Sequence, residues 1–377
     1  MIQLWEWKMS ELFEETEICG LRLRNRFVRS ATWLGLADAE GAVTDEMIER
    51  LRQLASGEPG LIIAGHAFVS AEGRAGMRQL GIHRDELVPG LRNMVRAVHE
   101  CGGVIVSQLA HAGILGNKPL SGLDAWALSK PDGYGHLALR VMTADEIAAV
   151  VEAFCKAAQR ACAAGFDGVQ IHAAHGYLLS QSLSAHFNLR TDEYGGTIDN
   201  RARMLLDILT GIRSRVGENY PILIKLNCED FVDGGLELKD SLRVGELLEK
   251  NGINAVEVSG GTGESKQLIP SRMGIKTPER EAYFAEQAGA FKKRLNVPVI
   301  LVGGIRSYEV AERILVQDKA DYLALCRPLI CEPDLIKRWA AGDRARAKCL
   351  SDNLCFKPAR AGEGVYCVTQ RRKNQLG

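Results

Sequence analysis

One segment of the chain, residues 171–204, is unusually dense in side chains that can do chemistry. It holds three His, two Tyr, two Asp, one Glu and three Arg around a pair of glycines. Its first part places the imidazoles of His172 and His175 and the phenol of Tyr177 within six residues. Such groups donate hydrogen bonds and transfer protons, so this segment is a candidate site of acid–base chemistry.

The elements that must position these groups follow a repeating pattern. Eight apolar, β-branched runs alternate with helical patterns, and such runs fit strands of a parallel sheet that is buried on both faces. The runs cover residues 26–33, 60–66, 103–111, 168–172, 221–227, 254–259, 298–304 and 321–327. This alternation predicts an α/β fold of the closed (β/α)8 TIM-barrel type. A Rossmann fold is disfavoured because no Gly-x-Gly-x-x-Gly follows the first strand.

The barrel is predicted over residues 12–342, between an N-terminal extension (1–11) and a Cys-containing C-terminal extension (343–377). The clearest helix begins at Thr143, which forms a capping-box pair with Glu146, and ends at Gly165. Residues 17–25 are expected to form a hairpin that closes the barrel bottom. The Gly/Pro-rich stretch between the third and fourth strands is expected to be a long loop over the mouth.

In such a barrel, functional side chains lie at the carboxyl ends of the strands. Those ends, and the turns that follow them, are expected to place fourteen residues around the mouth of the barrel. They are Ser30, Ala31, Thr32, Trp33, His66, Gln108, His172, His175, Tyr177, Lys225, Gly303, Gly304, Cys326 and Arg327. The last four follow strands seven and eight, where barrels usually bind phosphate. Two glycines let backbone N–H groups approach phosphate oxygens, and an arginine can bind them at two points. The pattern predicts a phosphorylated ligand.

Several segments, in the same order from about Leu12 to Trp339, resemble the Old Yellow Enzyme family of FMN-dependent oxidoreductases. They read LFEETEICGLRLRNRFVRSAT, SQLAHAG, HAAHGYLLSQSLS with NLRTDEYGGTIDNRARML, and LCRPLICEPDL. The resemblance extends to the N-terminal barrel of the 2,4-dienoyl-CoA reductases. It implies an FMN at the barrel mouth, NADH or NADPH as the hydride donor, and an activated alkene as the small-molecule substrate.

The same resemblance implies roles for the polar segment. His172 and His175 would bind the substrate carbonyl oxygen, and Tyr177 would protonate the α-carbon. Two imidazoles that donate to one oxygen stabilise developing enolate charge. A phenol, whose pKa is ordinarily about 10, is a suitable acid toward a carbanion-like carbon.

For FMN, the implied contacts surround the whole cofactor. Ser30, Ala31, Thr32 and Trp33 would line the ring, with Gln108 at its pyrimidine edge, Lys225 near N1 and O2, and Gly303, Gly304, Cys326 and Arg327 around the phosphate. The sequence departs from the family at two of the ring positions. Trp33, with Thr32 beside it, stands where many relatives carry Thr or Cys, and His66 replaces a small residue.

The tail is a third departure. Cys349, Cys355 and Cys367 remain of the four-cysteine motif that holds an iron–sulfur cluster in larger relatives, but Asp352 replaces the second cysteine. Three thiolates support a four-iron cluster poorly, so no cluster and no metal is expected. Asp352 could instead complete a set of four zinc ligands, which is the alternative.

Other residues of the polar segment are expected to be structural. Arg190, Asp192 and Glu193 can form an ion-pair network that braces the catalytic loop, and Gly195 and Gly196 permit its turn. The charge balance of the whole chain argues against nucleic-acid and membrane partners. Its 47 basic and 47 acidic residues cancel, so nucleic acid and anionic membranes exert no net attraction. With no secretory signal or apolar run of about 20 residues, a cytoplasmic location is expected. A homo-oligomer is expected as well.

Two other functions fit the same residues. The first is a flavin-free barrel lyase or isomerase that acts on a phosphorylated substrate, with His172 and His175 as acid and base. The second is a non-catalytic flavin-binding module. A purified flavoprotein is yellow, whereas the lyase or isomerase is colourless, and a binding module oxidises no NAD(P)H when an alkene is added.

Overall fold

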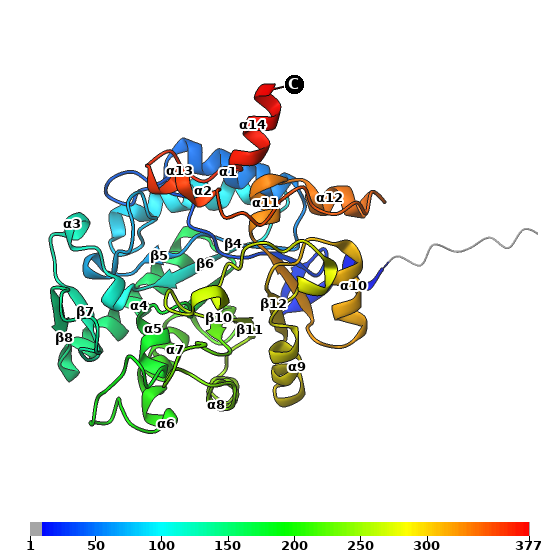
Figure 1. Ribbon diagram of the computed structural model, residues 1–377. Coiled ribbons are helices and arrows are strands. Elements are labelled where there is room, and N and C mark those ends of the chain that lie inside the picture. Colours follow the sequence, from blue (N-terminus) through cyan, green and yellow to red (C-terminus); the bar gives the residue numbers. More distant parts are fainter. Residues whose placement is uncertain (1–9, 377) are drawn as a thin grey trace, which may run out of the picture.

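The computed structural model describes residues 10–376, and its centre is a closed barrel of eight parallel strands (Figure 1). The strands are β3 (Phe27–Arg29), β4 (Leu61–Ile63), β6 (Ile105–Ala110), β9 (Gly168–Ala173), β10 (Ile222–Asn227), β11 (Ala255–Ser259), β12 (Val299–Val302) and β13 (Tyr322–Leu325). β13 pairs with β3 and β4 pairs with β6, so these eight strands close into a barrel, while the short β5 (Ala67–Phe68) pairs with the end of β6. The predicted (β/α)8 TIM barrel is confirmed. The extension predicted over residues 1–11 lies mostly outside the described residues.

Helices cover the outside of the barrel because each carries one apolar face toward the sheet. The main ones are α1 (Asp45–Ser56), α2 (Val88–His99), α4 (Ala144–Ala164), α7 (Arg203–Val216), α8 (Leu238–Lys250), α9 (Ala285–Arg294), α10 (Tyr308–Val316) and α12 (Leu335–Ala340). In α4, Thr143 and Glu146 make both capping-box hydrogen bonds, and Gly165 ends the helix with a φ of 88°. The predicted signals at both ends of this helix are confirmed.

A hairpin closes the barrel bottom, as predicted. β1 (Thr16–Ile18) and β2 (Leu21–Leu23) pair antiparallel across a turn in which Cys19 and Gly20 both have positive φ. Ile18 and Leu23 are buried against the inward side chains of the barrel strands. Apolar packing therefore seals this end and leaves the carboxyl ends of the strands for the site.

The segment between β6 and β9 is more ordered than the predicted loop. It contains a 3-10 turn (Gly113–Leu115), α3 (Lys118–Ser121) and two paired strands, β7 (Ala125–Ala127) and β8 (Leu139–Val141), on the left in Figure 1. The remaining elements are β5 (Ala67–Phe68), α5 (Leu178–Leu183), α6 (Ile198–Arg201), α11 (Arg327–Cys331), α13 (Phe356–Arg360), α14 (Val368–Leu376), and 3-10 turns at Glu11–Phe13, Ala71–Gly73, Asp85–Leu87, Lys266–Leu268 and Pro278–Arg280.

The C-terminal extension folds back on the barrel. The backbone N–H of Val365 donates to the Leu34 carbonyl at 2.8 Å, and the Arg78 guanidinium donates to the Gly362 carbonyl at 2.6 Å. A Cβ on Gly35 would lie 3.2 Å from Ala359 Cβ in α13, so this helix packs directly on the segment after β3. The extension thus covers the segments that follow β3 and β4. Within residues 10–376, no helix is both long and apolar enough to cross a membrane.

Candidate active site

A deep cavity opens at the carboxyl ends of the barrel strands, and it gathers almost all of the predicted site residues. Its wall contains Ser30, Ala31, Thr32, Trp33, His66, Gln108, His172, His175, Tyr177, Lys225, Gly304, Cys326 and Arg327. Gly303 is the exception, because it precedes Gly304 without lining the cavity itself. The wall also includes residues that the sequence reasoning missed, among them Ser259, Ser271, Tyr283, Arg306, Ser351 and Phe356.

The imidazoles and the phenol converge because the chain turns sharply after β9. His175 and Gly176 both have positive φ, 65° and 77°, and the His175 backbone N–H donates to Asn227 Oδ1 at 3.1 Å. The ring centroid of His172 lies 5.2 Å from that of His175 and 5.0 Å from that of Tyr177. The side chains therefore share one small volume at the cavity wall.

Two further hydrogen bonds orient these rings. His175 Nε2 pairs with Ser259 Oγ at 2.7 Å, and Tyr177 Oη pairs with His66 Nε2 at 3.2 Å. Among the residues described, His172 Nδ1 is buried and has no hydrogen-bond partner. Its imidazole nevertheless lines the cavity, and no hydrogen bond within the described residues engages its other nitrogen, Nε2, which is therefore available to a ligand.

Burial fixes the protonation of this cluster. It lowers the pKa of His66 to about 4, with the nearby Lys225 ammonium acting in the same direction. Burial also holds the pKa values of His172 and His175 well below their ordinary value. It raises the pKa of Tyr177 to about 12. At neutral pH the imidazoles are uncharged and the phenol keeps its proton.

A buried polar network forms the base of the cavity. Lys225 Nζ lies 3.0 Å from Glu257 Oε1 and donates to Ser30 Oγ at 2.7 Å, and Ser30 Oγ donates to the same carboxylate. Gln170 Nε2 donates to Glu257 Oε2 at 2.8 Å, and Gln108 Nε2 donates to Gln170 Oε1 at 2.7 Å. Lys225 is in register with Glu257 on one neighbouring strand and with His172 on the other. The network holds an ammonium and an amide at fixed positions.

Gln170 and Glu257 were missed by the sequence reasoning, although a signal was present. Each precedes a cavity residue, His172 or Ser259, by two positions on the same strand. Because side chains alternate across a strand, residues two apart face the same side. A polar residue at such a position in an otherwise apolar barrel strand is the signal.

The opposite end of the cavity suits an anion. Arg306 and Arg327 both line it, and no Asp or Glu belongs to its wall as described. Arg327 is held in place by Asn353 Oδ1 at 2.7 Å. Gly304 has a φ of 75°, and a Cβ there would lie 2.6 Å from the Tyr283 ring, so only glycine fits this wall. With Lys225 at the base, this donor set fits a phosphorylated cofactor such as FMN.

The C-terminal extension forms one wall of this anion end, through Ser351, Phe356 and the Asn353 contact. Asp352, the predicted alternative zinc ligand, instead accepts hydrogen bonds from Thr369 Oγ1 at 2.7 Å and from the Leu354 N–H at 3.1 Å. Among residues 10–376, no three His, Cys, Asp or Glu side chains gather as metal ligands do. The structure gives the zinc alternative no support.

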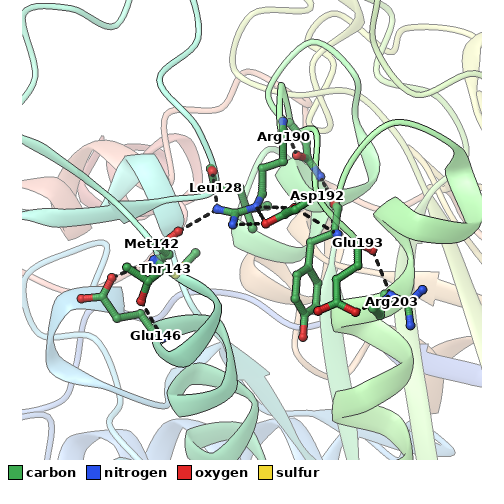
Figure 2. Close-up of polar contacts among 10 residues, drawn as sticks. Leu128, Met142, Thr143, Glu146, Arg190, Asp192, Glu193 and Arg203 are labelled. Carbon is green, nitrogen blue, oxygen red and sulfur yellow. Dashed lines mark hydrogen bonds and ion pairs between the residues drawn. The ribbon is translucent and has the colours of Figure 1, made fainter.

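Arg190 braces the segment behind the site, as Figure 2 shows. Its guanidinium binds the Asp192 carboxylate and also donates to the carbonyls of Leu128 and Met142, at 3.0 and 2.7 Å. Arg203 Nε donates to the Glu193 carbonyl at 2.9 Å. The predicted ion pair of Arg190 with Asp192 is confirmed, and Arg190 also reaches the β7–β8 segment, whereas the Glu193 carboxylate pairs with Arg203 at 4.0 Å.

The lowered pKa values predict a pH dependence of stability. Histidines that stay neutral when folded but ionise when unfolded stabilise the fold above the unfolded pKa of about 6.5, and this contribution is lost as pH falls toward the folded pKa. Each such histidine contributes a slope of at most about 1.4 kcal/mol per pH unit in that window. We expect urea midpoints measured from pH 7 to 4.5 to fall with a shallower slope in His66→Gln than in the wild type.

His136→Ala is the control for this slope, since His136 is exposed. An equal slope in the wild type and in His66→Gln would show that His66 ionises alike in both states.

A (β/α)8 barrel with a cationic end, a buried ammonium and neutral proton donors in one cavity can hold a phosphorylated cofactor beside groups that donate protons to a substrate. The chain belongs to the NADH:flavin oxidoreductase / NADH oxidase family, whose model matches residues 11–345. The resemblance to the Old Yellow Enzyme family is thereby confirmed. This membership disfavours the flavin-free lyase or isomerase.

Individual relatives agree with the family. An NADH oxidase of Thermoanaerobacter brockii is 36% identical over 349 residues, which cover 91% of this chain and 53% of that protein. A structure of 2-naphthoyl-CoA reductase with 2-naphthoyl-CoA matches 97% of this chain and 58% of that one, at 27% identity and a TM-score of 0.88. A structure of morphinone reductase in complex with tetrahydroNAD matches 88% of this chain and 91% of that one, at 26% identity and a TM-score of 0.74. The chain spans about half the length of the first curated relatives it matches.

Proposed function

We propose that this protein is an FMN-dependent NAD(P)H oxidoreductase that reduces carbon–carbon double bonds conjugated to a carbonyl group. The observation that carries the proposal is the convergence of His172, His175 and Tyr177 on the cavity that also holds Lys225 and the arginine end. When bound, FMN accepts a hydride from NADH or NADPH and supplies it to the β-carbon of the alkene.

The cofactor contacts follow the order of groups along the cavity. Lys225 and Gln108 would hold the pyrimidine edge, where a fixed cation favours the negative charge of the reduced ring. Arg327 and the backbone at Gly303, Gly304 and Cys326 would bind the phosphate, and Arg306 adds a second cation there. Ser30, Ala31, Thr32, Trp33 and His66 would line the ring.

The substrate carbonyl would lie between the two imidazoles. His172 lines the cavity, and its neutral imidazole can carry a hydrogen toward a carbonyl oxygen bound there. When Ser259 donates its hydroxyl hydrogen to His175 Nε2, the second imidazole keeps its hydrogen on Nδ1. Two neutral N–H donors can then stabilise negative charge that develops on the carbonyl oxygen.

Tyr177 would supply the proton. Its raised pKa, about 12, keeps the phenol protonated throughout the physiological range, so it can act as the acid toward the α-carbon. The relatives named as an NADH oxidase and as morphinone reductase with tetrahydroNAD support a nicotinamide donor. The cytoplasmic location, the homo-oligomer and the domain limits at 12 and 342 stay predictions.

A visible spectrum of the purified protein tests the proposal. We expect a flavin band that bleaches under anaerobic NADPH or NADH and returns when 2-cyclohexenone is added. A colourless protein that cannot take up FMN would overturn the proposal. Bound flavin that neither donor bleaches would instead identify a non-catalytic flavin-binding module.

A further inference from the structure

A second, outer cavity lies behind the catalytic phenol. Trp33, His66 and Tyr177 line both cavities, so these three side chains form the partition between them. The outer cavity is completed by Ala75, Gly76, Met77, Asn117 and Arg360. Met77 and Arg360 are exposed, which places the outer cavity at the protein surface.

His66 occupies a fixed position in this partition. Its Nε2 meets Tyr177 Oη at 3.2 Å, with the two rings edge to face at 66°. Its carbonyl accepts a hydrogen bond from Gln79 Nε2 at 3.3 Å, and the fully buried Gln79 also accepts from the N–H groups of Ala75 and Gly76. The loop that lines the outer cavity therefore also anchors His66.

The proposed reaction requires that the Tyr177 phenol be reprotonated after each turnover. Tyr177 loses its hydroxyl proton in every turnover and must regain one before the next. Phenolate is unfavourable in this buried position, and the hydrogen-bonding group that faces Tyr177 Oη is the His66 imidazole. Asp and Glu side chains belong to neither cavity wall as described, so no carboxylic acid borders the phenol.

We propose that His66 is a proton relay that reloads Tyr177 from solvent in the outer cavity. The O–H bond of Tyr177 breaks as the new C–H bond forms at the substrate α-carbon, and the hydrogen on His66 Nε2 passes to the phenol oxygen. A solvent proton binds His66 Nδ1 at the same time. One proton enters, one C–H bond forms, no electrons move in the relay, and the imidazole ends neutral as its Nδ1–H tautomer. Loss of the Nδ1 proton to solvent and uptake of a solvent proton at Nε2 restore the starting tautomer before the next turnover.

The surroundings of His66 favour this neutral relay over an ionised one. The titratable and charged groups around it are Tyr177, His172, His175, Lys225, Arg78 and Arg360. Three of them are basic side chains and none is a carboxylate, so an imidazolium at this position lacks a counter-ion. A tautomer exchange moves the proton without forming an imidazolium.

The relay rests on the proposed function, and one set of experiments tests the two separately. In His66→Ala we expect the alkene step, followed as flavin reoxidation by 2-cyclohexenone, to slow by about tenfold or more, and more than flavin reduction does. Added imidazole should restore the rate in proportion to its concentration, because the vacated site opens to the outer cavity. His66→Phe, which fills the site without a proton to transfer, should gain nothing from imidazole.

Two readouts report the relay without relying on the rate alone. The solvent isotope effect on the alkene step should change in His66→Ala and return with imidazole. In 15N-histidine NMR spectra of the oxidised protein, the Nε2 resonance of His66 should shift in Tyr177→Phe. His136→Ala is the control and should alter neither.

The outcomes separate cleanly. A wild-type protein that 2-cyclohexenone does not reoxidise would overturn the proposed function. A wild type that turns over, with a His66→Ala variant of equal rate, equal isotope effect and no response to imidazole, would overturn the relay. If His66→Ala does not fold, His66→Gln keeps a hydrogen-bonding side chain of similar size and carries the same expectations, apart from the imidazole rescue.

Discussion

Tyr177→Phe should leave flavin reduction by NAD(P)H nearly intact and slow alkene reduction by about 10²–10⁴-fold, the range for loss of a positioned general acid. The substitution removes one hydroxyl and keeps the ring that packs edge to face on His172 and His66. Stopped-flow absorbance of the flavin band measures the two half-reactions separately. The effect is confined to the second half-reaction, the reduction of the alkene, because only the alkene carbon takes the Tyr177 proton.

Tyr366→Phe is the matched control. Tyr366 lies in the C-terminal extension, where its hydroxyl donates to Glu363 at 3.1 Å, outside the cavity wall. Both half-reactions should match the wild type in this variant. If Tyr177→Phe instead abolished flavin reduction and spared alkene turnover, the assignment of Tyr177 as the proton donor would be wrong.

The fold was predictable where the pattern was long and repeated. Eight buried runs that alternate with helices define a barrel without further information, and the capping pair Thr143 and Glu146 located one helix to the residue. The β7–β8 pair was not predictable in the same way. Each of these strands has three residues, too few to show a periodicity, and both are held by Arg190 from a distant part of the chain.

The candidate site was predictable to the extent that it follows the strand ends. One rule, that chemistry sits at the carboxyl ends of barrel strands, located all of the predicted lining residues except Gly303. Residues that reach the cavity by tertiary folding were missed. Ser351 and Phe356 come from the C-terminal extension, and no local pattern indicates that this segment returns to the barrel mouth.

Glu257 was also missed, although its position two residues before Ser259 on the same strand was a signal. Its substitution gives the second large expected effect. Glu257→Gln should destabilise the protein by about 3–5 kcal/mol, since it leaves the Lys225 ammonium buried without its carboxylate. Both side chains are almost inaccessible, at 3% exposure for Lys225 and 0% for Glu257, so water replaces the lost carboxylate poorly. Urea unfolding of the flavin-free protein measures the change.

Two further variants isolate the buried charge as the cause. Asp199→Asn breaks an exposed pair with Arg243 and should cost no more than about 1 kcal/mol. The double variant Lys225→Met with Glu257→Met removes both charges and should recover much of the lost stability, because well-packed apolar groups often replace a buried pair at little cost. A loss in Glu257→Gln no larger than that in Asp199→Asn would contradict the argument. Such a result would mean that Ser30 and Gln170 provide enough hydrogen bonds for the Lys225 ammonium and the newly introduced amide without a carboxylate.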